Sequence, residues 1–438
     1  IRDSAYTIDI SEKQIILYGE SRRAVYYAVA EFLHNLGVRW YAPGKIGEII
    51  PSLKNINVKV GQINSAPDFI TRRIWSRPPD ELRWMYRNRL SDATIPCGHS
   101  LHSYAAALPG WHKSKTSIKE SRREFPEYYS IRGGKVGSFI NLASSNVVQI
   151  FASEVIKRFQ ENQAEKRQAG GKRGVDILSI SPDDGFLWDE RPEVAAMNSP
   201  EKDPILGMPS FSDAWFTFLS RICAEIDKKA PWLDFKLGSL AYMNYIMPPR
   251  KIRPDPRIVP VIAPITFNRY VSIGTPGALT SDILEDLIKK WVSISPRVGM
   301  YLYNFNLADM AMPYTRRVHW TKDFPKLFAL GIKDITIESH PNWHTMVPAN
   351  YVAARLLWNI NTDVNSLLRE YYTNYYGQAA EAMQQYDKTL ENAYETTKVF
   401  AGSIWGIHRI LTPEVLSLIH ISEPTRLLSI SYAVFCLK

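Results

Sequence analysis

Strand-like apolar runs alternate with helical patterns between about Pro67 and Trp358, and this alternation constrains the fold more than any other feature of the sequence. The eight runs lie at residues 70–75, 94–99, 138–142, 177–181, 235–242, 258–263, 299–304 and 334–338. Between them, apolar residues such as Val148, Phe151 and Val155 recur at the spacing of about 3.6 that is typical of amphipathic helices. Eight strands, each followed by a helix, predict an α/β protein with a (β/α)8 TIM barrel.

An open, doubly wound sheet is the alternative architecture, because it is built from the same alternation of strands and helices. Sheets of that kind commonly bind phosphate groups with a glycine-rich turn directly after a strand. No such turn follows any of the eight runs, so the sequence favours the barrel.

Shorter patterns on both sides of this stretch predict further domains. Before it, a strand at residues 14–18, a helix at 22–36 and a strand at 38–41 indicate a partial α/β domain. After it, helical patterns at 364–376 and 379–398 begin a helical region. The expected partial α/β domain, barrel and helical region cover residues 1–66, 67–360 and 361–415.

The last segment, residues 416–438, resembles the in-frame translation of a sequencing adapter with its index and flow-cell primer. We therefore expect this segment to be an artefact, the natural sequence to end near Val415, and no functional residue to lie in the tail. A natural amphipathic tail is the alternative. The chain also begins at Ile1 without a signal peptide, so we expect it to be a fragment of a longer protein.

Charge and composition exclude several functional classes. The net charge of +9 comes from 53 basic and 44 acidic residues that are spread along the chain, so we expect no nucleic-acid partner. No stretch reaches the roughly eighteen apolar residues of a membrane span. The three cysteines have no metal-binding spacing, and we expect no metal and no cofactor. The oligomeric state stays open.

Catalytic groups of a TIM barrel lie at the carboxyl ends of its strands, so polar and aromatic residues after each run are the candidates for substrate contacts. These candidates are Arg72, Arg73, Trp75, His99, His102, Asn141, Tyr242, Tyr303, Asn304, His340 and Trp343. His99 and His102 could share a metal with His340 or His344. No metal-binding motif joins these histidines, so contacts with substrate hydroxyls are the favoured interpretation.

Two strand ends carry carboxylates. The segment SISPDDG places Asp183 and Asp184 side by side, where one can face a substrate while the other orients it. An Asp-Gly turn without a catalytic role is the alternative. Glu338 ends an alternating apolar strand, and its alternative role is a structural ion pair with one of the two arginines at the first run.

The N-terminal part of the chain resembles a known domain. Residues 26–33 and 36–44, which read YYAVAEFL and LGVRWYAPG, are similar to the α/β domain that precedes the barrel in bacterial alpha-glucuronidases and beta-N-acetylhexosaminidases. The resemblance implies the same order of domains. It does not identify catalytic residues, because no catalytic motif of those enzymes aligns with this sequence.

Further motifs resemble a family of bacterial proteins that is catalogued only as a domain of unknown function. They include FPEYY at residues 125–129, SISPDDG at 179–185 and LLW at 356–358, and the resemblance covers nearly all of residues 1–386. It implies secreted, polysaccharide-associated relatives of glycoside hydrolases. Members often carry a cysteine cluster where this chain has FLWDER at 186–191, so no role of such a cluster is expected here.

From these residues and resemblances we expect a glycoside hydrolase that acts on a bacterial, plant or host polysaccharide or glycan. Two carboxyl groups would flank the glycosidic bond, with Asp184 as the acid and Glu338 as the base or nucleophile. Asp183 would be the orienting neighbour of Asp184. Whether the reaction retains or inverts the anomeric configuration stays open.

The expected substrate contacts depend on the kind of sugar. Trp75, Trp343 and Tyr303 would stack on sugar faces, and Arg72 or Arg73 would meet a uronate carboxylate if the sugar is acidic. The alternative is a carbohydrate-binding surface protein that has the barrel without the chemistry. In either case we expect a secreted, periplasmic or outer-surface location.

Overall fold

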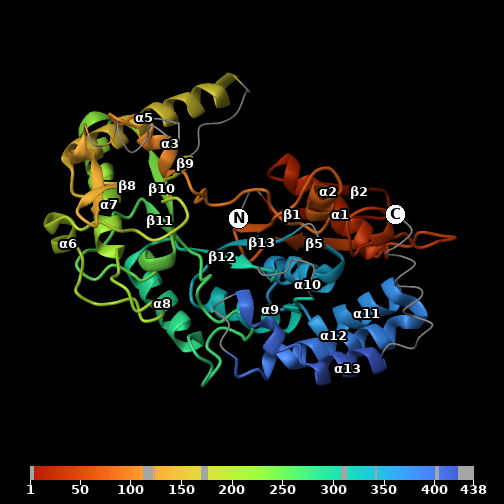
Figure 1. Cartoon of the computed structure of the whole chain (residues 1–438). Coiled ribbons are helices and arrows are strands. Elements are labelled where there is room, and N and C mark those ends of the chain that lie inside the picture. Colours follow the sequence, from red (N-terminus) through yellow and green to blue (C-terminus); the bar gives the residue numbers. More distant parts are fainter. Residues whose placement is uncertain are drawn as a thin grey trace. The chain divides into compact units, whose positions relative to one another are not determined.

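A computed structural model describes residues 4–111, 122, 124–168, 176–306, 313–340, 343–399 and 404–422 of the 438-residue chain. The structure is mixed α/β, and Figure 1 labels its helices and strands. It divides into two compact units. The first contains Ile1–Thr94, Phe267–Leu284 and Tyr301–Lys438, and the second contains Ile95–Thr266 and Glu285–Met300. The boundaries expected at residues 66, 360 and 415 stay predictions.

The largest sheet has six strands in the order β6-β13-β12-β11-β10-β9. In chain order these strands span Thr71–Ile74, Asp176–Ser179, Phe235–Ala241, Ile258–Ile262, Gly299–Tyr303 and Asp334–Glu338. Strand β6 pairs in parallel with β13, and β9, β10, β11 and β12 pair in parallel in turn. Six of the eight predicted strands therefore lie in one six-stranded sheet, and a closed eight-stranded barrel is not confirmed.

The run at residues 94–99 is not a strand. It is fixed by side-chain hydroxyls instead of a backbone ladder: Ser179 Oγ donates to the Gly98 carbonyl at 2.6 Å, and Ser181 Oγ donates to the Cys97 carbonyl at 2.7 Å. Pro96 within the run has no N–H to donate. An apolar pattern cannot distinguish such a segment from a strand, which explains why the prediction was wrong.

The run at residues 138–142 is a strand of another sheet. Strand β8 (Lys135–Ile140) pairs antiparallel with β7 (Tyr129–Arg132). Gly133 and Gly134 join them with φ angles of 57° and 67°, the left-handed pair that a two-residue hairpin turn requires. The prediction that this run belongs to the barrel was therefore wrong.

The first unit begins with a small antiparallel sheet in the order β2-β1-β5. Its strands are β1 (Tyr6–Ile10), β2 (Ile15–Gly19) and β5 (Gly61–Ser65), and helix α1 (Arg22–Asn35) contacts β1 and β2. The alternating burial of β1 places Tyr6, Ile8 and Ile10 in a core with Tyr27 of the helix. Ser21 caps α1 by accepting the Ala24 N–H at 3.0 Å. The strand and helix expected here are confirmed.

The rest of the first unit is mostly helical. Helices α11, α12 and α13 lie side by side in Figure 1, and α12 contacts both neighbours. Helical patterns at 364–376 and 379–398 thus correspond to α11 and α12. The remaining elements of this unit are β3 (Arg39–Trp40), β4 (Glu48–Ile49), α2 (Asp80–Arg87), α9 (Arg317–Ala329), α10 (Val347–Trp358), α11 (Val364–Tyr376), α12 (Ala380–Glu395), α13 (Pro413–Ser422) and the 3-10 turns Lys45–Gly47, Trp343–Thr345, Gly377–Ala379 and Ile404–Arg409.

In the second unit, helices pack on the strands through the predicted apolar faces. Val148, Phe151 and Val155 of α5 are buried, and helices α5 and α7 contact each other. The elements of this unit, apart from the strands already given, are α3 (Leu101–Ala105), α5 (Ser145–Gln168), α6 (Pro192–Met197), α7 (Ser212–Lys229) and the 3-10 turns Pro126–Tyr128 and Met243–Tyr245. Helix α8 (Ser281–Ile294) and strand β12 begin in one unit and end in the other.

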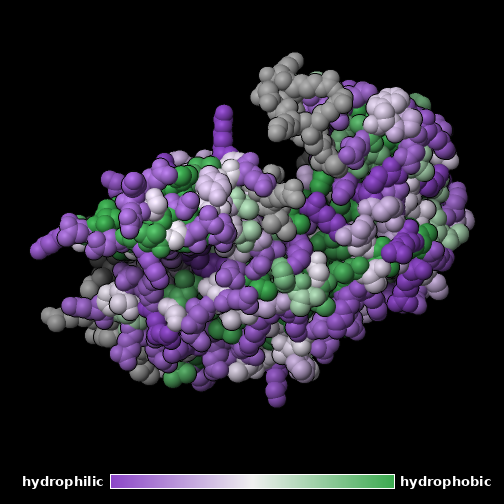
Figure 2. Space-filling model, turned by 180° about the vertical axis from the view of Figure 1, so that it is seen from behind, coloured by the Kyte–Doolittle hydropathy of each residue, from purple (hydrophilic) through white to green (hydrophobic). Residues whose placement is uncertain are grey.

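Hydrophilic side chains predominate on the face drawn in Figure 2, and hydrophobic ones form scattered patches between them. The large aromatic side chains that the composition provides are mainly interior, with Trp84, Trp215, Trp291 and Trp320 fully buried. Among the helices that the structure describes, none is both long and apolar enough to cross a membrane.

Candidate active site

In the second unit, the loop after β9 brings together four of the predicted site residues. His99 Nε2 lies 3.0 Å from Asp184 Oδ1, and His102 Nδ1 lies 2.9 Å from Asp183 Oδ1. The Asp184 side chain is 75% exposed and that of His99 is 34% exposed, so the first pair can meet a ligand from solvent. We call these four residues, with Tyr242, the β9-loop cluster.

The two ring nitrogens of His99 contact two different groups. Its Nδ1 is 2.5 Å from the Pro182 carbonyl oxygen, which can only accept a hydrogen bond, so Nδ1 is the donor. Its Nε2 faces Asp184 Oδ1. His99 therefore holds the carboxyl group of Asp184 in position relative to the backbone of the same loop.

The position of His99 depends on a close approach of the chain to β10. A Cβ on Gly238 of β10 would lie 1.9 Å from the Pro96 carbonyl oxygen, so only glycine allows the segment before His99 to lie there. Ser100 Oγ then donates to the Ser179 carbonyl at 3.0 Å, just beyond His99. The buried thiol of Cys97 in this segment stays protonated, because burial raises its pKa to about 12.

Tyr242 follows β10 and completes the β9-loop cluster. Its hydroxyl donates to Asp184 Oδ1 at 3.4 Å, and its ring meets the His99 ring edge to face with centroids 6.0 Å apart. Asp184 is therefore oriented by a hydroxyl and an imidazole that come from two different segments. The two aspartates follow β9, Tyr242 follows β10, and the two histidines lie at or just after the end of the run at residues 94–99.

In the first unit, Glu338 ends β13 and is oriented by a tyrosine of β12. Tyr301 Oη donates to Glu338 Oε2 at 2.8 Å, and the Asn304 N–H donates to the Glu338 carbonyl at 2.9 Å. The Glu338 side chain is partly exposed. The Tyr301 ring contacts Trp75 edge to face at 6.1 Å, and Trp75 is 44% exposed. We call Glu338, Tyr301, Trp75 and Tyr303 the β13-end cluster.

Tyr301 was missed by the sequence analysis, which considered only residues at or after the strand ends. A signal was available, because Tyr301 and Tyr303 are two residues apart on one strand and so point to the same face. Their rings are 5.5 Å apart, and the guanidinium of Arg269 lies 5.2 Å from the Tyr303 ring.

Several predicted substrate contacts are buried and have structural partners. Arg72 is fully buried and donates to the carbonyls of Phe69 and Arg89, so it has no surface to meet a uronate. Trp343 is 5% exposed and packs against Trp84 at 4.8 Å, so it offers no free face to a sugar. For both residues, burial corrects the expected role.

Two asparagines are also structural. Asn304 is fully buried and donates to Asn350 Oδ1 at 2.6 Å. Asn141 is buried near the β7–β8 hairpin, where its side chain donates to the Glu127 carbonyl at 3.0 Å and accepts the Ala143 N–H. Burial again explains the difference from the expectation, because a strand-end position in sequence does not tell whether the side chain reaches solvent.

The other two candidates remain partly exposed. Arg73 donates to the Asp92 carbonyl at 3.2 Å, and the His340 ring lies 6.0 Å from the Phe305 ring. The side chain of His344 lies outside the described residues. Within the described part of the chain, no group of three or more histidine, cysteine, aspartate or glutamate side chains could bind a metal ion.

Solved structures with a similar fold are glycoside hydrolases. The chain matches CpGH89 from Clostridium perfringens, solved in complex with its substrate GlcNAc-alpha-1,4-galactose, with a TM-score of 0.50 and 10% identity over 90% of this chain and 49% of that one. A family GH115 4-O-methyl-alpha-glucuronidase with specificity for decorated arabinogalactans matches with a TM-score of 0.47 and 12% identity, over 90% and 52%. A GH138 enzyme targeting pectin rhamnogalacturonan II matches with a TM-score of 0.38 and 10% identity, over 90% and 50%.

The fold of the chain is thus similar to that of the glycoside hydrolase CpGH89. The chain spans about half the length of each of the three structures. Residues 41–388 match the family described as "Domain of unknown function (DUF4838)", so the chain belongs to that family. This confirms the resemblance to a family of unknown function. No curated protein matches the chain.

Proposed function

We propose that the protein is a glycoside hydrolase in which Asp184 and Glu338 act as a pair. Asp184 would protonate the oxygen of the leaving sugar as the glycosidic C–O bond breaks. Glu338 would either take a proton from the attacking water or attack the anomeric carbon itself. In both routes the hydroxyl group of the water is added to one sugar. The proton of the water goes to the carboxyl pair and replaces the proton that Asp184 gave to the leaving sugar.

The observation that carries this proposal is the contact of His99 with the exposed carboxyl group of Asp184, where Nε2 lies 3.0 Å from Oδ1. A general acid must be able to reach the substrate and to exchange a proton with its surroundings. Asp184 is 75% exposed and has an imidazole beside it, so its position meets both requirements. An Asp-Gly turn without chemical function would not need the histidine.

The β13-end cluster supports the second role. The Tyr301 hydroxyl donates to Glu338 Oε2 and so holds the carboxyl group in one orientation, as a base or nucleophile requires. The exposed Trp75 ring beside Tyr301 is a surface on which a sugar ring can stack. Arg73 remains the candidate for a uronate carboxylate because it is partly exposed.

The test is the release of reducing sugar from a panel of plant, bacterial and host glycans. We expect the unmodified chain to cleave at least one of them, and the double variant Asp184→Asn, Glu338→Gln to cleave none. The variant Asp183→Asn is the matched control, since Asp183 has the same side chain and also pairs with a histidine.

The main alternative is a carbohydrate-binding protein without activity, for which the exposed Trp75 would be sufficient. Binding of a glycan by the unmodified chain, with no release of sugar from any member of the panel, would favour it. A secreted, periplasmic or outer-surface location would suit either function, since both have an extracellular polysaccharide as ligand.

A further inference from the structure

A cavity of about 390 Å³ in the first unit is distinct from the residues of the proposed reaction. Its buried lining includes Arg355 and Trp358 from the last turn of α10, together with Arg89. Asn64 and Asn359 line it as well and are exposed, so the cavity opens to solvent. The volume is within the range of about 300–1,000 Å³ found for small-molecule sites. We call it the Arg355 cavity.

Arg355 is a buried cation without a carboxylate. Its side chain is 6% exposed, yet within the described residues no acidic group lies within 4 Å of it. It makes one side-chain hydrogen bond, from Nη2 to Tyr351 Oη at 3.2 Å, and its Nε is buried without an acceptor among those residues. A guanidinium has five N–H donors and is rarely buried unless it is paired. The guanidinium also lies 5.0 Å from the centroid of the Tyr351 ring. The terminal Nη groups, and not the inaccessible Nε, are therefore the donors that a ligand in the cavity could meet.

The neighbouring arginines Arg39 and Arg89 need no anionic ligand, because each is paired with a carboxylate of the protein. Arg39 donates to both oxygens of Glu370, at 2.5 and 2.9 Å, and Arg89 pairs with Glu31. Of these three, only Arg355 makes no ion pair within the described part of the chain. Its charge still acts on Glu370, whose pKa is lowered by the hydrogen bond to Arg39 and also by the charge of Arg355. Glu31 and Asp68 line the cavity together with Arg89 and Arg355, so the cavity wall carries charges of both signs.

His34 also lines the cavity and adds a second unused polar atom. Burial, and the charges of Arg355, Arg39 and Arg89, hold the pKa of His34 well below its usual range, so the ring is neutral. Its Nε2 has no hydrogen-bond partner among the described residues and almost no accessible surface, so the neutral ring adds no charge to the cavity wall.

Asp68 favours a ligand that carries hydroxyl groups as well as negative charge. It lines the cavity and uses Oδ2 to accept the Ile360 N–H at 2.8 Å. A carboxylate in the same cavity would repel a bare anion, but it accepts hydrogen bonds from hydroxyls. Trp358 is not a stacking surface for a sugar, because Tyr6 stacks on it at 5.5 Å and Arg89 lies 5.0 Å from its ring.

We propose that the Arg355 cavity binds a small hydroxylated carboxylate, a sugar acid by chemical class. The ligand carboxylate would accept from the guanidinium of Arg355, and its hydroxyls would bond to Asp68 and Asn64. A bidentate arginine–carboxylate pair satisfies the donors that the protein leaves unused. This binding does not depend on the proposed hydrolase activity.

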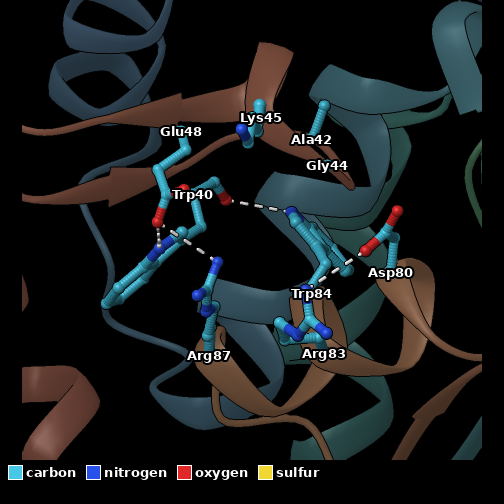
Figure 3. A pocket seen from close by; sticks show the side chains of 9 residues that line it. All are labelled: Trp40, Ala42, Gly44, Lys45, Glu48, Asp80, Arg83, Trp84 and Arg87. Atoms are coloured by element: carbon cyan, nitrogen blue, oxygen red, sulfur yellow. Dashed lines mark hydrogen bonds and ion pairs between the residues drawn. The ribbon is translucent and has the colours of Figure 1, made fainter.

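A smaller cavity of the same unit provides the contrast and the control. It encloses about 260 Å³, and Figure 3 shows that its two arginines already have carboxylates. Arg83 Nη1 lies 3.3 Å from Asp80 Oδ1, and Arg87 Nη1 lies 3.3 Å from Glu48 Oε1. Both arginines are accessible to solvent and paired with a carboxylate, so neither needs an anionic ligand.

Calorimetric titration of the full chain with glucuronate tests the proposal. We expect glucuronate to bind, acetate and glucose to bind at least about tenfold more weakly, and Arg355→Met to weaken glucuronate binding by at least about tenfold. Arg83→Met should leave the affinity unchanged. Because Arg355→Met removes a buried unpaired charge, its melting temperature without ligand should not fall.

Two results would overturn the proposal. One is the absence of binding of both glucuronate and gluconate to the unmodified chain. The other is binding that Arg355→Met leaves intact. If Arg355→Met does not fold, Arg355→Lys keeps the charge but loses the planar fork, and it should then bind glucuronate more weakly than the unmodified chain. Equal affinity in that variant would equally contradict the proposal.

Discussion

The β9-loop cluster and the β13-end cluster orient their carboxylates in different ways. Asp184 lies on a loop, its side chain is 75% exposed, and the His99 imidazole contacts it. Glu338 lies at the end of a strand, is only partly exposed, and accepts from a tyrosine of the next strand. The first environment suits a group that exchanges a proton with its surroundings, and the second suits a group that must keep one orientation. The predictions below test this contrast.

The largest effects are expected from removing either carboxylate. Asp184→Asn and Glu338→Gln keep the side-chain volume but can neither transfer a proton nor attack carbon. We expect each to lower kcat on a natural glycan by about 10³-fold or more, with the melting temperature little changed. Steady-state kinetics and thermal unfolding measure both. Near-normal kcat in the two variants would show that the carboxylates are structural.

Replacing His99 should have the next largest effect. In His99→Asn the amide can still donate toward the Pro182 carbonyl, but no imidazole lies beside Asp184. We expect kcat to fall by about 10²-fold with KM little changed, because the acid loses the group that orients it. A purely structural histidine would lower the melting temperature without this selective loss of kcat.

A smaller effect is expected at Tyr301. Tyr301→Phe removes one hydrogen bond to Glu338 while the ring still contacts Trp75. Loss of a hydrogen bond to a charged group corresponds to about tenfold in kcat, with KM little changed. The measurement is the separate determination of kcat and KM. An effect confined to KM would mean that Tyr301 contacts substrate and does not orient Glu338.

The smallest effect is expected at Asp183. Its partner His102 is 61% exposed. The Asp183–His102 pair lies next to Asp184 but takes no part in the proposed proton transfer. We expect Asp183→Asn to change kcat by less than about threefold, as is usual for an exposed pair. If this variant is as impaired as Asp184→Asn, the roles of the two neighbouring aspartates must be exchanged.

Strand-end reasoning from the sequence named the residues of the β9-loop cluster but not their contacts with one another, and it named the β13-end cluster without Tyr301. His99, His102, Asp183 and Asp184 come together because the segment before His99 is tied to β9 through serine hydroxyls. The pattern of apolar residues cannot show such ties, so this segment was expected to be a strand. It also cannot show the turn at Gly133, which turns a predicted barrel strand into part of a hairpin.

Burial explains most of the remaining differences. Asn304 and Trp343 follow strands in the sequence and Arg72 lies within β6, but all three side chains are buried. Tyr301 also lies within a strand, and its hydroxyl contacts the Glu338 carboxylate. Position along a strand predicts which edge of a sheet a residue reaches, and long-range packing decides whether it reaches a substrate.

The most direct test of the account compares two substrates of one sugar that differ only in the leaving group. A good leaving group, such as dinitrophenolate, departs without protonation, whereas an alkoxide needs an acid. We predict that Asp184→Asn cleaves the dinitrophenyl glycoside at close to the normal rate and the alkyl glycoside poorly, while Glu338→Gln fails on both. Equal impairment of Asp184→Asn on the two substrates would contradict the assignment of Asp184 as the acid.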